Sequence, residues 1–110
     1  MLPLRHRLTK NGSFNYLYAH GNRQSAKKVK LNFIRSKAGI KVGFSVSNKV
    51  GKAVVRNLVK RRMRAIVSSV LSNIKPCQAV FVASVGIDEL TFEELQSQML
   101  ICLRKAGLID

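Results

Sequence analysis

The sequence predicts an α+β fold, a single-domain α–β sandwich of order α-βββ-α-β-α, and three observations carry this prediction. Apolar residues alternate with polar ones in two segments before residue 50, which is typical of strands with one buried face. Later segments repeat their apolar residues at helical spacing, on either side of a short run that is apolar almost throughout. A length of 110 residues suits one domain with one core.

The first predicted element is a short helix between Asn11, which offers an N-cap, and Gly21, which offers a stop. Phe14, Leu17 and Tyr18 have the spacing i, i+3, i+4 and therefore share one face of this helix. By default such aromatic residues belong to a hydrophobic core. Residues 1–10 precede the helix as a basic segment that we expect to be mobile.

Two strands follow a polar, loop-like stretch over residues 21–28. Val29–Phe33 and Ile40–Ser47 both alternate with period two, and Lys37–Gly39 supplies a turn between them. We therefore expect these strands to pair as a hairpin with their apolar faces on the core. Their opposite sheet face would then carry Lys30, Asn32, Lys41, Ser45 and Ser47.

A long amphipathic helix is predicted from about Lys52 to Asn73. Its apolar stripe consists of Val55, Val59, Met63, Ile66, Val67, Val70 and Ile74. On the other side, Arg56, Lys60 and Arg64 follow one edge at intervals of four residues. Asn57 and Arg61 lie beside that edge. Guanidinium groups suit phosphate oxygens and base edges, so this pattern predicts a helix that docks on nucleic acid.

The last two elements are a strand and a helix. Ala79–Val85 is apolar almost throughout, as in an interior strand that is covered on both faces. Thr91 and Glu94 form the T-x-x-E pattern of a capping box at the start of a helix that ends near Gly107. This helix is expected to bury Phe92, Leu95, Met99, Cys102, Leu103 and Ala106.

The charge is distributed very unevenly. The chain has 20 Lys and Arg against 5 Asp and Glu, a formal net charge of +15, and its first acidic residue is Asp88. The first 87 residues carry 18 of the basic groups, because only Arg104 and Lys105 come later. Self-repulsion of this size disfavours the compact state, and a polyanion relieves it. No apolar run approaches the roughly 20 residues of a membrane span, so RNA or DNA is the favoured partner.

Compartment is indicated by two further features. The chain begins Met-Leu-Pro-Leu-Arg, without the long apolar core of a signal peptide, which favours a cytoplasmic location. Cys77 and Cys102 lie in apolar surroundings without C-x-x-C spacing. We interpret them as buried thiols in a reducing compartment, and a disulfide between them is the less favoured alternative.

With this order of elements in place, the chain resembles the protein subunit of bacterial ribonuclease P, the ribonucleoprotein that removes 5′ leaders from precursor tRNA. The resemblance lies in Val42–Ser47, Lys49–Val54 and the basic positions from Arg56 to Arg64, which are in register with the family signature. Arg7-Leu8, Phe14, Tyr18, His20 and Gly21 resemble its first helix, and Thr91-Phe92 its C-terminal segment. The similarity covers essentially the whole chain.

One position departs from the family pattern. The central triplet is usually Arg-Asn-Arg, whereas this chain has Arg56-Asn57-Leu58. The second arginine is absent, although Arg62 lies four residues further, one turn along nearly the same edge. One RNA contact is therefore in question, but the assignment is not.

The resemblance implies a division of labour between protein and RNA. The RNA subunit carries the catalytic site and the Mg²⁺ ions, and the protein itself holds none. The protein binds that RNA and holds the single-stranded leader of the precursor in a cleft between the first helix and the central sheet. Helices would then cover one face of the sheet, and the cleft would lie on the other.

The same comparison gives expected contacts for each partner. RNA binding is expected from Lys52, Arg56, Asn57, Lys60, Arg61, Arg62 and Arg64, although Asn57 has the alternative of a local cap. The leader cleft is expected to contain Phe14, Tyr18, Lys30, Asn32, Ser45 and Ser47. Nonspecific phosphate contacts are expected from Arg5, Arg7 and Lys10.

Catalytic groups of a protein nuclease are not evident. Two-metal hydrolysis usually requires clustered carboxylates, and the first 87 residues contain none. The carboxylates of Asp88, Glu89, Glu93 and Glu94 do cluster, but at a turn and a helix start, where acids stabilise the helix dipole. His6 and His20 have no acidic neighbour in sequence. A ribosomal-type structural protein and a free-standing nuclease are the alternative functions.

Overall fold

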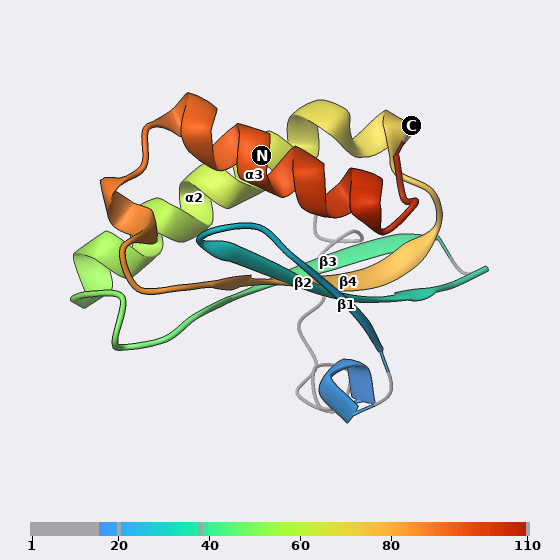
Figure 1. The fold of residues 1–110 in the computed structure, drawn as a ribbon, viewed down its shortest axis with the longest axis horizontal. Helices are drawn as coiled ribbons and strands as arrows, with labels where there is room; N and C mark the ends of the chain where they lie inside the picture. The colour runs from blue at the N-terminus through green and yellow to red at the C-terminus, as the bar shows by residue number, and fades with distance from the viewer. Residues whose placement is uncertain (1–15, 20, 38, 110) are drawn as a thin grey trace.

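The computed structural model describes residues 16–19, 21–37 and 39–109. It contains a four-stranded sheet in the order β1-β2-β4-β3, with α2 and α3 on one face and a helical segment at residues 16–19 on the other (Figure 1). The strands are β1 (Asn22–Ser25), β2 (Val29–Arg35), β3 (Ile40–Val46) and β4 (Cys77–Ala83). The helices are α2 (Ala53–Val70) and α3 (Phe92–Lys105), with 3-10 turns η2 (Leu71–Asn73) and η3 (Ile87–Glu89).

The predicted hairpin between β2 and β3 is wrong. Strand β4 lies between them, antiparallel to β2 and parallel to β3. A parallel pair needs a long crossover connection, and α2 provides it between β3 and β4. The apolar character of β4 is explained by this central position, so the prediction of an interior strand is confirmed.

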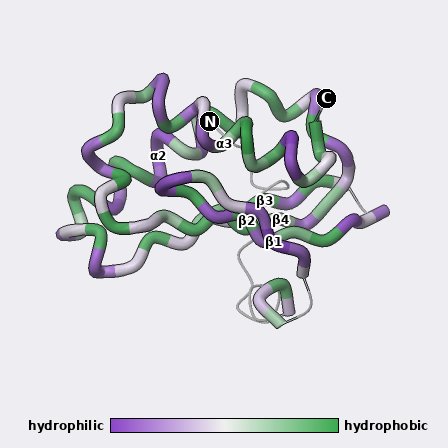
Figure 2. The backbone as a smooth tube through the Cα atoms, viewed as in Figure 1, coloured by the Kyte–Doolittle hydropathy of each residue, from purple (hydrophilic) through white to green (hydrophobic). Residues whose placement is uncertain are grey.

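Strand β1 occupies part of the segment that was interpreted as a loop. It pairs antiparallel with β2, with Arg23 opposite Asn32 and Ser25 opposite Lys30. Its four residues are all hydrophilic (Figure 2), and it forms the edge of the sheet, so no alternation of apolar residues marks it. Edge strands with polar side chains are common because one side faces solvent.

The hydrophobic core lies between the sheet and the two long helices. The odd-numbered residues of β2 and β4, with Phe81 fully buried, face the helices. The stripe predicted on α2 is confirmed: Val59, Met63, Ile66 and Val67 are buried. A second, small cluster lies on the opposite sheet face, where Leu17 packs on Val80.

Both thiols lie inside the main core, as predicted. Cys77 and Cys102 are free and buried. Burial raises the pKa of the Cys77 thiol to about 11 and also raises the pKa of Cys102. A thiol that stays protonated at neutral pH is a poor nucleophile, so both cysteines act as small apolar core residues.

Helix α3 begins with the predicted capping box. The Glu94 backbone N–H donates to the Thr91 hydroxyl at 3.1 Å, and the Thr91 N–H donates to the Glu94 carboxylate at 2.9 Å. The pKa of the Glu94 carboxyl is lowered mainly by the hydrogen bond from the Thr91 backbone N–H and further by the Thr91 side chain. The helix buries Leu95, Met99, Cys102 and Leu103. Phe92 was expected in this group but is 39% exposed, because it is the first helical residue and lies at the rim of the core.

Candidate nucleic-acid interface

The sheet face opposite the helices is mixed in character, because polar side chains of β2 and β3 lie beside the apolar Ile34, Val80 and Val82. Alternation within β2, β3 and β4 places their other residues on this face, and the pairing aligns them in rows across the strands. One row runs Ser25, Lys30, Val82, Ser45, and the next runs Arg23, Asn32, Val80, Gly43. The predicted placement of Lys30, Asn32, Lys41 and Ser45 on this face is confirmed, and exposed Ser47 directly follows β3.

The helical segment at residues 16–19 covers part of this face. Leu17 is fully buried on Val80, and half-buried Tyr18 packs against the same small cluster. The Arg23 guanidinium donates to the Tyr18 carbonyl at 2.9 Å and thereby ties the segment to β1. Phe14, predicted to lie beside Tyr18, falls outside the described residues. Tyr18 therefore lies between the helical segment and the sheet face on which a cleft was predicted.

Gly21 is what allows the helical segment to approach the sheet so closely. A Cβ at this position would lie 2.5 Å from the Leu17 carbonyl oxygen and 3.1 Å from that of Phe33. Real Cβ atoms essentially never approach another atom to 2.5 Å, so a side chain here would force the backbone to shift. The same residue donates its backbone N–H to the Leu17 oxygen at 2.8 Å and ends the helix.

Strand β1 adds residues to the face that the sequence did not indicate. Arg23 and Ser25 lie on it because they are paired with Asn32 and Lys30. Asn32 is the buried polar residue of the described chain, with 8% of its surface exposed. Because β1 is polar and shows no periodicity, the sequence did not predict a strand there, and Arg23 was therefore not predicted as a residue of this face.

Helix α2 presents the basic edge that was predicted. Asn57 and Arg61 are exposed, whereas Arg56, Lys60 and Arg64 are half-buried, as long basic side chains are when their aliphatic stems cover apolar surface. The helix contains no acidic residue, which excludes ion pairs within it. Leu58, at the position that departs from the family pattern, is 39% exposed.

The N-terminus of α2 adds to the positive potential. Lys52 is its N-cap, without a side-chain cap, and no acidic residue is present in the first turn. The first N–H groups of an α-helix carry the positive end of the helix dipole. With exposed Lys49 and Lys52 beside it, this end of the helix is strongly electropositive.

Two arginines of α2 differ from the others in their local contacts. The Arg62 guanidinium donates to the Leu90 carbonyl at 3.4 Å, a long and weak hydrogen bond that joins α2 to the segment before α3. The Nε of Arg56 is buried and has no hydrogen-bond partner among the described residues. Arg62 thus makes a weak contact within the protein, whereas the Arg56 Nε–H is a donor without a partner among the described residues.

Four of the five acidic residues lie close together in sequence, in η3 and at the start of α3. Asp88 and Glu89 lie in η3, and Glu93 and Glu94 lie in the first turn of α3, where they complement the helix dipole. In the described part of the chain, no group of three His, Cys, Asp or Glu side chains is placed to hold a metal ion. His6 and His20 lie outside that part. No helix within residues 16–19, 21–37 and 39–109 is long and apolar enough to cross a membrane.

Comparison with known sequences identifies a family over nearly the whole chain. The family model described as Ribonuclease P matches residues 2–107. A ribonuclease P protein component from Finegoldia magna is 36% identical over 102 residues, which cover 92% of this chain and 90% of that protein. The corresponding protein from Streptococcus agalactiae is 30% identical over 105 residues, which cover 94% and 96% of the two chains.

Solved structures agree with this match. The ribonuclease P protein of Staphylococcus aureus superimposes with a TM-score of 0.89 at 25% identity, covering 96% of this chain and 98% of that one. The ribonuclease P protein of Thermotoga maritima has the same fold, with a TM-score of 0.79 at 23% identity over 86% of this chain and 92% of that one. The α+β sandwich is therefore the fold that this chain shares with these proteins.

Proposed function

The chain belongs to the ribonuclease P protein family, and from that premise we propose that it is the non-catalytic protein component of this RNA-based endoribonuclease. In this role it binds the catalytic RNA subunit and the single-stranded 5′ leader of precursor tRNA in the cytoplasm. It promotes hydrolysis of the phosphodiester bond that frees the mature tRNA 5′ end. The protein alone does not cleave RNA.

The observation that supports the proposal is that one small domain carries two surfaces of different chemistry. The edge of α2 is a row of cations without acidic partners, which suits the phosphates of folded RNA. The sheet face opposite the helices combines the polar side chains of Lys30, Asn32 and Ser45 with the aromatic ring of Tyr18, which suits unpaired bases. A protein that binds one structured RNA and one single strand needs both kinds of surface.

The role of Mg²⁺ follows from the same distribution of charge. We assign the ions of the holoenzyme mainly to RNA, because the carboxylates at η3 and α3 serve the helix cap and dipole. Two polyanionic RNAs repel each other, and divalent ions normally screen this repulsion. A chain with 18 basic groups in its first 87 residues supplies part of that screening.

The test compares precursor and mature tRNA. At low Mg²⁺, adding the chain to its RNA subunit should raise affinity for the precursor more than affinity for mature tRNA, since only the precursor has a leader. The gain should fall steeply with salt through counterion release. Filter binding at several salt concentrations measures it. An equal gain for both tRNAs would contradict leader binding, and recovery of ribosomal RNA as the bound partner would support the ribosomal-type alternative.

A further inference from the structure

We propose that the RNA-binding face continues over the β1 edge into a second subsite for single-stranded RNA, which holds the part of the leader farther from the cleavage site. This inference rests on the proposed function, because it concerns the same leader. The subsite is an open pocket of about 340 Å³ at the β1–β2 edge. It is lined by Arg23, Gln24, Ser25, Lys30, Asn32 and Lys105.

The pocket is joined to the predicted cleft through shared residues. Arg23 and Asn32 form one cross-strand pair on the open face, and Ser25 and Lys30 form the next. Arg23 also bonds the Tyr18 carbonyl at 2.9 Å. A strand of RNA that leaves Tyr18 toward β1 therefore meets Arg23 first and the pocket immediately after it.

Lys105 adds a cation from a distant part of the chain to the pocket at the β1 edge. It is the last residue of α3, on the other side of the sheet, and its ammonium group donates to the Ser25 carbonyl at 3.2 Å. This contact holds a third cation beside Arg23 and Lys30, although Lys105 is 80 residues from Ser25 in sequence. Three cations converging on one pocket favour phosphate.

Asn32 gives the pocket a group that can contact a base. It is 8% exposed, and no hydrogen bond joins its carboxamide to another residue in the described part of the chain. A carboxamide both donates and accepts, which matches the edge of an unpaired base. The arrangement therefore suits one nucleotide with its base on Asn32 and the flanking phosphates on the cations.

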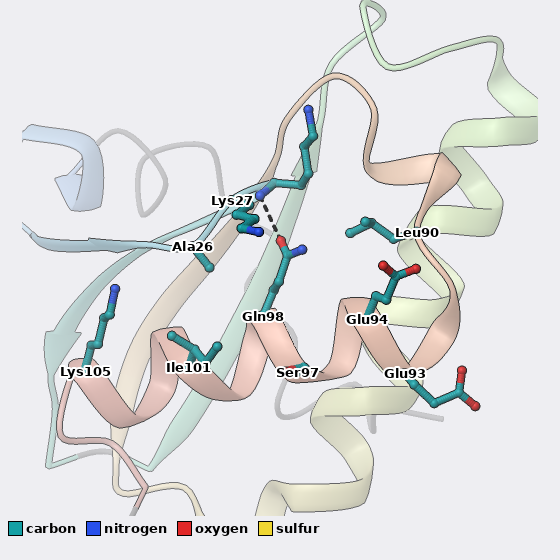
Figure 3. A pocket seen from close by; sticks show the side chains of 10 residues that line it. Ala26, Lys27, Leu90, Glu93, Glu94, Ser97, Gln98, Ile101 and Lys105 are labelled. Atoms are coloured by element: carbon teal, nitrogen blue, oxygen red, sulfur yellow. Dashed lines mark hydrogen bonds between the residues drawn. The ribbon is translucent and has the colours of Figure 1, made fainter.

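The neighbouring groove along α3 limits where the RNA can go. Figure 3 shows Lys105 at one end of this groove and Glu93 at the other, with Glu94 near Leu90. Between them, the Gln98 side-chain oxygen accepts a hydrogen bond from the Lys28 backbone N–H at 2.8 Å, which joins α3 to the start of β2. The carboxylates of Glu93 and Glu94 repel phosphate at the far end of the groove, whereas Lys27 and Lys28 lie nearer β1, so phosphate is favoured at the β1 end.

The test is the affinity of the assembled RNA–protein complex for precursors with leaders of increasing length, at one fixed salt concentration. Lys105→Ala should weaken binding of long-leader precursors by about five- to tenfold. Short-leader precursors and mature tRNA should bind as before, and Lys105→Arg should restore affinity. The matched control is Arg104→Ala, which removes the same charge from the adjacent residue, outside the pocket.

The outcomes separate this subsite from the proposed function itself. Tyr18→Ala should reduce affinity already at short leaders, and Lys105→Ala only beyond a longer threshold. Equal losses for Lys105→Ala and Arg104→Ala would overturn the subsite, and so would a loss for Lys105→Ala at every leader length. Neither result would contradict binding of the leader at Tyr18. If leader length has no effect on the wild-type complex, the proposed function fails as well.

Discussion

Replacement of Arg56, Lys60 and Arg64 by alanine, one at a time, is expected to weaken assembly with the RNA subunit by about 1–3 kcal/mol each. The physical reason is the loss of a charge-assisted hydrogen bond from a side chain that no acidic group in α2 neutralises. Each replacement should also reduce the dependence of binding on salt, because fewer counterions are released. Titration of labelled RNA subunit with each variant at several salt concentrations measures both effects.

The fold should survive these replacements. None of the three side chains belongs to the buried stripe of α2, and changes outside a buried core usually shift the free energy of unfolding by roughly 0.5 kcal/mol or less. For Arg56 the change also removes a buried, unpaired Nε. Lys37→Ala, an exposed lysine before β3, is the control for loss of one charge. A sharp drop in melting temperature would instead assign these residues to the structure.

Replacement of Tyr18 by alanine is expected to weaken binding of leader-bearing precursors by about 1–3 kcal/mol, the usual loss for one stacked base. Tyr18 is half-buried and packs against the Leu17–Val80 cluster on the sheet face opposite the helices, so part of its side chain stays accessible. Mature tRNA should bind almost as before. Phe14→Ala should behave similarly if its ring lies beside Tyr18, as the sequence predicts. Affinity against leader length, with a melting curve for each variant, is the measurement.

Leu17 provides the comparison for packing alone. It is fully buried on Val80, so Leu17→Ala should lower the free energy of unfolding by about 2–5 kcal/mol. Tyr18→Phe retains the ring and should retain most of the affinity. If Tyr18→Ala melts as poorly as Leu17→Ala and loses affinity equally at all leader lengths, Tyr18 is a core residue and not part of a leader cleft.

The elements that could be predicted are those that a local sequence pattern marks, such as apolar residues repeating at the spacing of a helix or strand. Helix α2 has a continuous apolar stripe opposite its basic edge, and the capping box of α3 is a local pattern of two residues, Thr91 and Glu94. Strand β4 is apolar because helices cover one face and Leu17 packs on the other. Each signal is local, so each was visible without the fold.

The failures concern pairing, which is not local. The alternation of apolar and polar residues identifies β2 and β3 as strands, but it contains no information on their order in the sheet, where β4 lies between them. Strand β1 has no apolar period, and its role comes from its partner β2. For the same reason the sequence indicated Asn32 and Tyr18 as site residues but not Arg23 or Lys105, which reach the open face only through β1 and the end of α3.

The most direct test of the proposed function is reconstituted cleavage of precursor tRNA at low Mg²⁺. The RNA subunit, this chain and the two together are each incubated with a 5′-labelled precursor, and the released leader is measured. We expect cleavage at the mature 5′ end only by the two together, because the RNA supplies catalysis and the basic protein supplies screening and leader binding. Cleavage by the chain alone, or an RNA subunit that cleaves equally well without it, would contradict the proposal.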